Sequence, residues 1–185
     1  NWKKGVDWYE KSYFSGLESN KSIGEFTPSY LASKICVSRI KKTLASDIKF
    51  IVLLRNPIDR AYSHYLHTKR DEYENLSFLD ALEKEDERLK ENIDNKDDIS
   101  FTRFCYKYSG MYALHLKNYL SKFDEKQFCI ILFDDFVNKR EEVINRILIF
   151  LNVDLNVSLN IEIKINPASK ARSIQLKKFM AQKSF

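Results

Sequence analysis

The stretch from Lys49 to His67, KFIVLLRNPIDRAYSHYLH, constrains the fold of this 185-residue chain more than any other part of the sequence. Its apolar run Phe50–Leu54 is continuous and has the length of a strand. A run without alternation is typical of a strand that is covered on both faces of a parallel sheet. The run stops at Arg55. We therefore predict an α/β domain in which a strand of a parallel sheet carries an arginine at its carboxyl end.

A helix is predicted directly after this strand. Asn56 is a favoured N-cap residue, and Pro57 fits the first helical turn, where no backbone N–H is needed. In open α/β sheets, ligands bind in the crevice beyond the carboxyl ends of the strands. A guanidinium beside a helix N-terminus suits an anionic ligand, so the stretch predicts an anion site at Arg55. The alternative is an ordinary strand-to-helix turn whose arginine is solvated.

A second apolar run, Phe128–Phe133, repeats this pattern and ends at Asp134 and Asp135. Apolar residues recur after it at helical spacing, and the order strand, helix, strand, helix predicts βαβ units with right-handed crossovers. Apolar periodicity also predicts helices at about 1–17, 30–45, 78–89 and 112–123, and a short strand at Ile23–Phe26.

Length and composition indicate one globular domain that spans residues 1–185. The chain is 44% hydrophobic and 31% charged, and no apolar run approaches the ~20 residues that span a bilayer. The net charge of +5 is unevenly distributed, because every charged residue after Glu162 is basic. This asymmetry favours an anionic ligand near the basic end, and a solvated basic helix explains it equally well.

The cysteines and histidines indicate neither a disulfide framework nor a metal site. Cys36, Cys105 and Cys129 are odd in number, have no CxxC spacing and lie among apolar neighbours, so we expect free thiols in the core of a cytoplasmic protein. No carboxylate or cysteine cluster joins the three histidines at the spacing of metal ligands. Abundant Lys, Asn and Ile with scarce Pro and Gly favour a bacterial source.

The run LLRNPIDRAYSHYLH resembles the 3′-phosphate-binding motif of sulfotransferases that use 3′-phosphoadenosine 5′-phosphosulfate (PAPS). Within that superfamily it is most similar to the Golgi heparan-sulfate sulfotransferases and their bacterial relatives. The resemblance implies that Arg55 and Ser63, eight residues apart, bind the 3′-phosphate of the nucleotide. It also implies a three-layer fold of the P-loop nucleotide-binding type, with a central parallel sheet flanked by helices.

A second motif extends the resemblance to the acceptor side. The heparan-type enzymes carry the pattern Glu-Lys-(Ser/Thr)-Pro/Ala-x-Tyr, in which the Glu is the proposed catalytic base. The segment GEFTPSY is similar, which implies that Glu25 takes the acceptor proton. It departs at Phe26, where the family often has a lysine that contacts sulfate or substrate. This departure argues against a glycosaminoglycan acceptor more than against sulfuryl transfer. The alternative role of Glu25 is a capping carboxylate for the helix after Pro28.

The resemblance implies a sulfotransferase that moves a sulfuryl group from PAPS to a hydroxyl or amine of a small molecule or carbohydrate, without a metal. Such a transfer needs in-line positioning, cationic cover for the moving oxygens and a base. In the tail INPASKARSIQLKKF, Arg172 is expected to contact a phosphate of the donor, with a surface position as the alternative. No nucleic-acid partner and no membrane span are expected, and the oligomeric state is not predicted.

Family members hold the 5′-phosphosulfate with an N-terminal strand, loop and helix that contain a lysine followed by Ser or Thr. No such loop occurs in the 185 residues, whose four glycines are isolated. We therefore expect the natural gene to extend upstream and these residues alone to lack transferase activity. The main alternative is an inactive sulfotransferase-like module that binds an anionic ligand or a protein partner. A more distant alternative is a P-loop-type kinase in which Asp134 and Asp135 serve a magnesium ion.

Overall fold

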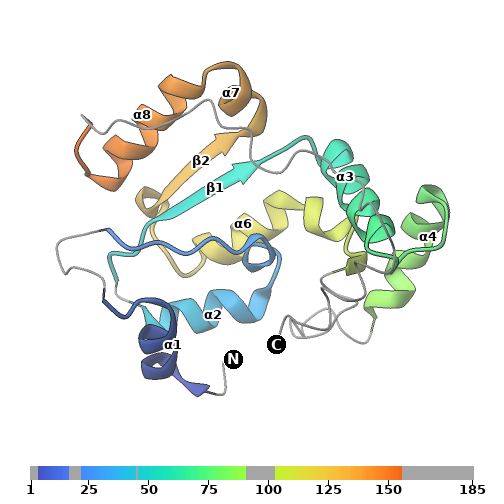
Figure 1. Cartoon of the computed structure of the whole chain (residues 1–185), viewed down its shortest axis with the longest axis horizontal. Helices are drawn as coiled ribbons and strands as arrows, with labels where there is room; N and C mark the ends of the chain where they lie inside the picture. The colour runs from blue at the N-terminus through green and yellow to red at the C-terminus, as the bar shows by residue number, and fades with distance from the viewer. Residues whose placement is uncertain (1–3, 17–21, 45, 91–102, 156–185) are drawn as a thin grey trace. The chain divides into compact units, whose positions relative to one another are not determined.

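The two predicted apolar runs form neighbouring parallel strands in the computed structural model of the chain (Figure 1). Strand β1 spans Phe50–Leu54 and strand β2 spans Phe128–Leu132, in a register that runs from Phe50 opposite Phe128 to Leu54 opposite Leu132. The structure describes residues 4–16, 22–44, 46–90 and 103–155. The parallel pairing and the helices between the strands confirm the predicted α/β class.

Helices, including short 3-10 turns marked η, make up the other elements of the described ranges. In chain order they are α1 (Val6–Tyr13), η2 (Pro28–Tyr30), α2 (Lys34–Thr43), α3 (Pro57–Arg70), α4 (Phe78–Leu89), η3 (Tyr108–Gly110), α6 (Tyr112–Leu120), η4 (Glu125–Gln127), α7 (Phe133–Asn138) and α8 (Arg140–Leu151).

The segment before β1 differs from its prediction in two ways. Ile23–Phe26 pairs with neither strand, and Phe26 is 87% exposed, so this segment offers no apolar face that a sheet would bury. The helix predicted over 30–45 is interrupted, because η2 ends at Tyr30 and α2 begins only after Ser33. The Ser33 hydroxyl accepts a hydrogen bond from the Cys36 backbone N–H at 3.4 Å and so caps α2.

Helices pack on both faces of the sheet. On one face, the rings of Phe50 and Phe128 stack with centroids 4.7 Å apart and pack with Tyr119 of α6. Successive side chains of a strand point to opposite faces. Ile131 accordingly lies on the other face, where it packs with Val143 of α8. The sheet thus lies between two helical layers, as the three-layer prediction requires.

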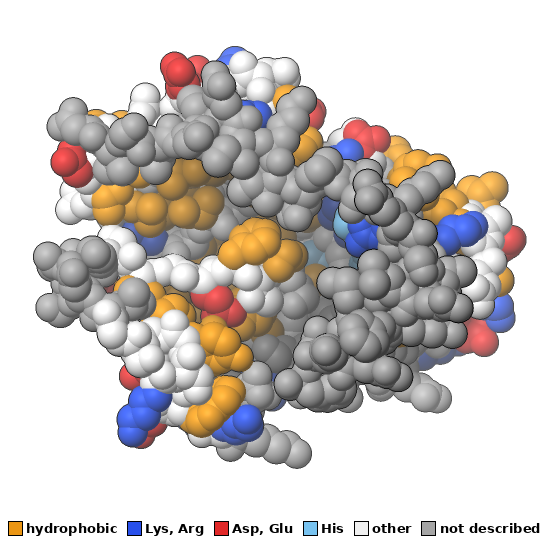
Figure 2. Space-filling model, viewed as in Figure 1, with side chains coloured by type: hydrophobic (Ala, Val, Ile, Leu, Met, Phe, Trp, Pro, Cys, Tyr) orange, Lys and Arg blue, Asp and Glu red, His pale blue; other side chains and the backbone are white. Residues whose placement is uncertain are grey.

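The cover of the sheet is incomplete. Ile51 and Leu53 of β1 are 45% and 46% exposed, and Ile130 and Leu132 of β2 are 42% and 56% exposed. Hydrophobic side chains are accordingly visible on the face of the molecule near the strands and α8 (Figure 2). The prediction that β1 is covered on both faces is therefore wrong, because the apolar contacts of α8 centre on Ile131 and its neighbours in β2.

Cys36, Cys105 and Cys129 are free and buried, as the sequence predicted. Burial raises the pKa of the Cys105 thiol to about 12, so its reactive thiolate form is scarce at neutral pH. None of the helices in the described ranges has the length and apolar character that crossing a membrane requires.

Candidate functional site

Arg55 lies directly after β1, at the carboxyl edge of the sheet, and two aromatic residues hold it there. The Tyr112 hydroxyl, from α6, donates a hydrogen bond to the Arg55 carbonyl oxygen at 2.9 Å. The Arg55 guanidinium lies over the ring of Phe133, 5.2 Å from its centroid. Its backbone and its side chain are therefore each fixed by an aromatic residue of another element.

Phe133 reaches Arg55 because of the strand register. Leu54 lies opposite Leu132, so the residues that follow them, Arg55 and Phe133, emerge next to each other at the edge of the sheet. Sequence analysis did not assign Phe133, although aligning the two apolar runs would have placed it beside Arg55. Tyr112 carried no comparable signal, since its bond spans 57 residues and depends on how α6 packs.

The N-terminal donors of α3 are already paired. The Asn56 side-chain oxygen accepts hydrogen bonds from the backbone N–H groups of Ile58 at 2.9 Å and Asp59 at 3.4 Å, and the Arg60 N–H donates to the Asn56 carbonyl oxygen at 2.9 Å. Pro57 has no N–H. An anion at this edge would therefore be held by side chains, and the helix would contribute only its dipole.

Ser63 is half-buried in α3, and its hydroxyl has no hydrogen-bond partner among the described residues. Seven residues make almost two turns of a helix, so Ser63 lies on the same face of α3 as Asn56. Arg55 directly precedes Asn56. Arg55 therefore lies just before the N-terminus of α3, and Ser63 lies about 10 Å further along the helix on the face of Asn56, a spacing that a ligand contacting both would have to span.

Glu25 lies in irregular chain before η2 and is exposed. One of its carboxylate oxygens, Oε1, accepts hydrogen bonds from the Thr27 hydroxyl at 2.7 Å and from the Tyr30 hydroxyl at 2.8 Å. Burial raises the pKa of Tyr30 to about 12, and its hydrogen bond to Glu25 acts in the same direction. The phenol is therefore a protonated donor at neutral pH. Both contacts come from side-chain hydroxyls, whereas a helix cap accepts from backbone N–H groups, so these two bonds leave the base interpretation open and do not by themselves support the cap.

Helix α6 connects the Glu25 segment to the Arg55 edge. At one end of α6 the Tyr112 hydroxyl bonds the Arg55 carbonyl oxygen, and at the other the Tyr119 hydroxyl bonds the Tyr30 carbonyl oxygen at 2.9 Å. Seven residues of helix separate the two tyrosines, which is a rise of about 10 Å. One helix therefore sets the spacing between the residue that bonds Glu25 and the backbone of Arg55.

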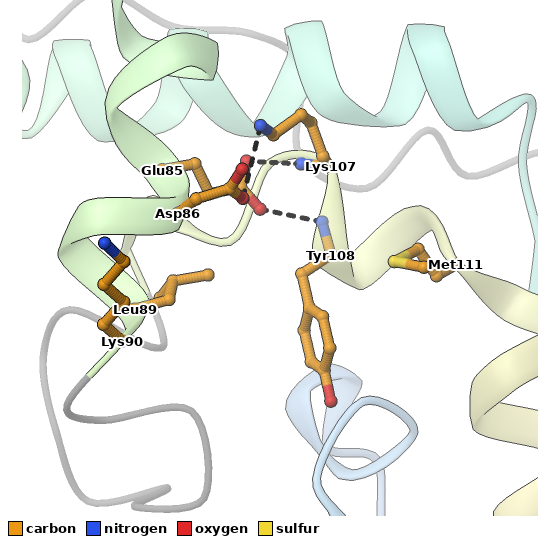
Figure 3. A pocket seen from close by; sticks show the side chains of 7 residues that line it. All are labelled: Glu85, Asp86, Leu89, Lys90, Lys107, Tyr108 and Met111. Carbon is orange, nitrogen blue, oxygen red and sulfur yellow. Dashed lines mark hydrogen bonds and ion pairs between the residues drawn. The ribbon is translucent and has the colours of Figure 1, made fainter.

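A buried carboxylate fixes η3 beside α3. Glu85 of α4 is fully buried, and its two oxygens accept hydrogen bonds from the backbone N–H groups of Lys107 at 2.6 Å and Tyr108 at 2.7 Å (Figure 3). The turn ends at Gly110, where an added Cβ would lie only 3.2 Å from the Cβ of Pro57. Glu85 thus helps to hold η3 against the first turn of α3.

A cavity of about 340 Å³ lies beside this turn and contains none of the predicted site residues (Figure 3). The Lys107 ammonium lies 3.3 Å from a carboxylate oxygen of Asp86 at its rim. The Arg55 site is therefore an edge of the sheet and not part of this cavity. The cavity is lined by Glu85, Asp86, Leu89, Lys90, Lys107, Tyr108 and Met111.

Arg172, the third residue expected to contact the donor, lies outside the described residues. Asp134 and Asp135, which the kinase alternative would use, lie in the first turn of α7. Across the described ranges, no group of His, Cys, Asp and Glu side chains is arranged to hold a metal ion.

His115 is fully buried in α6, and its Nε2 lies 2.7 Å from the Tyr108 carbonyl oxygen. A carbonyl oxygen can only accept, so Nε2 carries the proton and Nδ1 is the unprotonated nitrogen. Nδ1 is buried without a partner in the described chain. Burial lowers the pKa of His115; the bond to Tyr108 opposes this effect and the Arg60 guanidinium adds to it.

We predict that His115 makes the fold sensitive to mild acid. Because folding lowers its pKa below the usual 6.5, the unfolded chain binds the proton first, and stability falls as the pH drops below about 6.5. Between pH 7.5 and 5.5, His115→Gln should lose less free energy of unfolding than the wild type, by up to about 1 kcal/mol. Urea unfolding at both pH values measures the difference, and equal losses in the two proteins would contradict it. Burial also raises the pKa of Glu85, but this residue is present in both proteins, so its contribution to the pH dependence is the same in each and drops out of the difference.

The sequence matches the sulfotransferase domain family over residues 4–184. It is 30% identical over 136 residues to carbohydrate sulfotransferase 15 of Homo sapiens, covering 67% of this chain and 24% of that protein. It is 27% identical over 158 residues to heparan sulfate glucosamine 3-O-sulfotransferase 3B1 of Homo sapiens, covering 83% of this chain and 36% of that protein.

Among solved structures, the fold is similar to the crystal structure of a sulfotransferase from Alicyclobacillus acidocaldarius, with a TM-score of 0.74 and 31% sequence identity. That match covers 89% of this chain and 63% of the other. The chain thus spans between a quarter and about a third of the length of the two human relatives. With the family match over nearly the whole chain and the shared α/β fold, the chain belongs to the sulfotransferase domain family.

Proposed function

We propose that the chain binds PAPS through its 3′-phosphate and takes part in moving its sulfuryl group to a hydroxyl or amine acceptor. The observation that carries this proposal is the fixed arginine at the carboxyl edge of β1. Tyr112 holds the Arg55 backbone and Phe133 underlies its guanidinium, so little freedom is lost when an anion binds. Ser63 offers an available hydroxyl from the same helix face that follows the arginine.

The chemistry of these two side chains suits a phosphate. A guanidinium presents several N–H donors in a rigid fork that matches phosphate oxygens, and such charge-assisted bonds are about twice as strong as neutral ones. A hydroxyl adds a further donor. Because the backbone donors of α3 are occupied by Asn56, the affinity for the 3′-phosphate should depend strongly on Arg55.

In the proposed transfer, an acceptor oxygen or nitrogen attacks the sulfur of PAPS. A bond forms between the acceptor and sulfur, and the bond from sulfur to the 5′-phosphate oxygen breaks, which leaves adenosine 3′,5′-bisphosphate. The acceptor proton passes to the Glu25 carboxylate, which would act as the general base. Arg55 and Tyr30, whose hydroxyl bonds Glu25, are held at opposite ends of α6, and this separation supports the division of roles.

The acceptor is proposed to be a carbohydrate, because the relatives include a carbohydrate sulfotransferase and a heparan sulfate sulfotransferase. Phe26, beside Glu25, bears on the kind of carbohydrate. Its ring is 87% exposed, and it stands where the heparan-type pattern often has a lysine. An exposed aromatic ring favours an apolar face of an acceptor over an anionic one.

We predict that Arg55→Ala weakens binding of adenosine 3′,5′-bisphosphate by ~1.5–3 kcal/mol, the usual worth of charge-assisted hydrogen bonds. Isothermal titration calorimetry measures this loss. Adenosine 5′-monophosphate, which lacks the 3′-phosphate, is the control ligand, and its affinity should not change. Arg70→Ala, at the far end of α3, is the matched control variant. Equal affinity of wild type and Arg55→Ala for the bisphosphate would remove the proposal.

Phe133→Leu should also weaken binding of the bisphosphate, because it keeps apolar volume but removes the aromatic face beneath the guanidinium. A partly exposed cation–π contact is worth ~0.5–1 kcal/mol, which corresponds to roughly two- to five-fold in affinity. The same titration measures the loss, and the melting temperature checks that α7 remains folded. If the folded variant binds as tightly as the wild type, the stack does not prepare Arg55.

Glu25→Gln should lower the turnover of the natural gene product by roughly 10²–10⁴-fold while its nucleotide affinity and melting temperature stay unchanged. The reason is that a base for the acceptor proton acts only in the chemical step. Retained turnover would instead assign Glu25 to the local cap of η2.

A second candidate function is binding without turnover, which the local hydroxyl contacts of Glu25 also allow. Arg55-dependent binding of the bisphosphate, together with no sulfuryl transfer by the natural gene product, would favour this module over the enzyme.

A further inference from the structure

We propose that Tyr30 is a positioning residue that orients the Glu25 carboxylate and fixes it relative to the Arg55 edge. This inference rests on the proposed function, in which Glu25 is the base. It goes further by assigning the orientation of that base to one phenol. The Tyr30 hydroxyl donates to Oε1 of Glu25 at 2.8 Å.

Two hydroxyls bond the same carboxylate oxygen, but only one of them is anchored to the core. Thr27 lies two residues from Glu25 and is the N-cap of η2, so its bond to the carboxylate is a local one. Tyr30 lies in η2, and its carbonyl oxygen accepts a hydrogen bond from the Tyr119 hydroxyl at 2.9 Å. Tyr30 is therefore the point at which the core determines where the carboxylate lies.

The anchor itself is rigid. Tyr119 is only 3% exposed, and its ring packs edge-on against Phe50 of β1 with centroids 5.5 Å apart. Four residues after Phe50, the same strand ends at Leu54 and leads into Arg55. The path from Glu25 through Tyr30 and Tyr119 thus ends on the strand that presents the proposed phosphate ligand.

Three hydroxyls of the described chain contact the Glu25 carboxylate, from Thr27, from Tyr30 and from Tyr9 of α1. Burial raises the pKa of Tyr9, and its hydrogen bond to Glu25 raises it further, so this phenol also stays protonated. Hydroxyls that donate to a carboxylate favour its charged form and lower its pKa. Removing one donor should therefore raise the pKa of Glu25.

The first test is an NMR titration of the chain with ¹³C-labelled glutamate carboxylates, which follows Glu25 directly and needs no activity. Tyr30→Phe removes only the hydroxyl and leaves the carbonyl that Tyr119 bonds. It should raise the Glu25 pKa. Tyr13→Phe removes a phenol of α1 that has no bond to Glu25, and it should leave that pKa unchanged. An unchanged Glu25 pKa in folded Tyr30→Phe would overturn the proposal.

The second test is the pH dependence of turnover by the natural gene product. Tyr30→Phe should lower kcat about tenfold with an unchanged KM for PAPS, the loss expected for one hydrogen bond that orients a reacting group. The acid limb of its pH–rate profile should move upward by the shift seen in NMR. A merely structural role would lower the melting temperature and leave both the Glu25 pKa and the acid limb in place.

The two tests separate the failure of this inference from that of the proposed function. If the natural gene product transfers no sulfuryl group, the proposed function fails, and the NMR titration still decides whether Tyr30 orients Glu25. If the wild type is active and Glu25→Gln is inactive, but Tyr30→Phe retains the wild-type pKa and pH profile, only the role of Tyr30 is overturned.

Discussion

The two hydroxyl-to-carbonyl hydrogen bonds at the ends of α6 are the constraint on which the candidate site depends. Tyr112 bonds the Arg55 carbonyl oxygen and Tyr119 bonds the Tyr30 carbonyl oxygen. Both acceptors are backbone carbonyl oxygens, so the bonds fix the main chain and leave the side chains of Arg55 and Tyr30 to contact a ligand or a neighbouring residue. Since a helix has a fixed rise per residue, the spacing of the two bonded segments is set by the fold.

The parallel register supplies the other half of the arrangement. It places Phe133 beside Arg55 at the edge of the sheet, where the ring supports the guanidinium. The Asn56 cap then occupies the first backbone donors of α3, so in the proposed site the recognition of an anion would rest on the side chains of Arg55 and Ser63. A site of this kind is more sensitive to side-chain substitution than one built from backbone amides.

The elements defined by local chemistry could be predicted from the sequence. Both strands, the Asn56 cap and the helix over 78–89 follow from apolar runs, turn residues and periodicity, and all of them are present. The break between η2 and α2 was missed because Leu31 and Ala32 continue the apolar pattern across it, while the cap at Ser33 depends on a single hydroxyl. The exposure of Ile51 depends on which helices cover β1, and the sequence around Ile51 does not predict which helices those are.

For the candidate site, the sequence predicted Glu25, Arg55 and Ser63 because they lie in short contiguous motifs, and their roles as ligands and base stay predictions. It could not predict the residues that hold them. The bonds of Tyr112 and Tyr119 join residues 57 and 89 positions apart, and they arise only when α6 packs against the sheet.

A crystal structure with adenosine 3′,5′-bisphosphate tests the account most directly. We expect the 3′-phosphate within hydrogen-bond distance of the Arg55 guanidinium and the Ser63 hydroxyl; a nucleotide bound elsewhere, with Arg55 still stacked on Phe133 and unliganded, would contradict it.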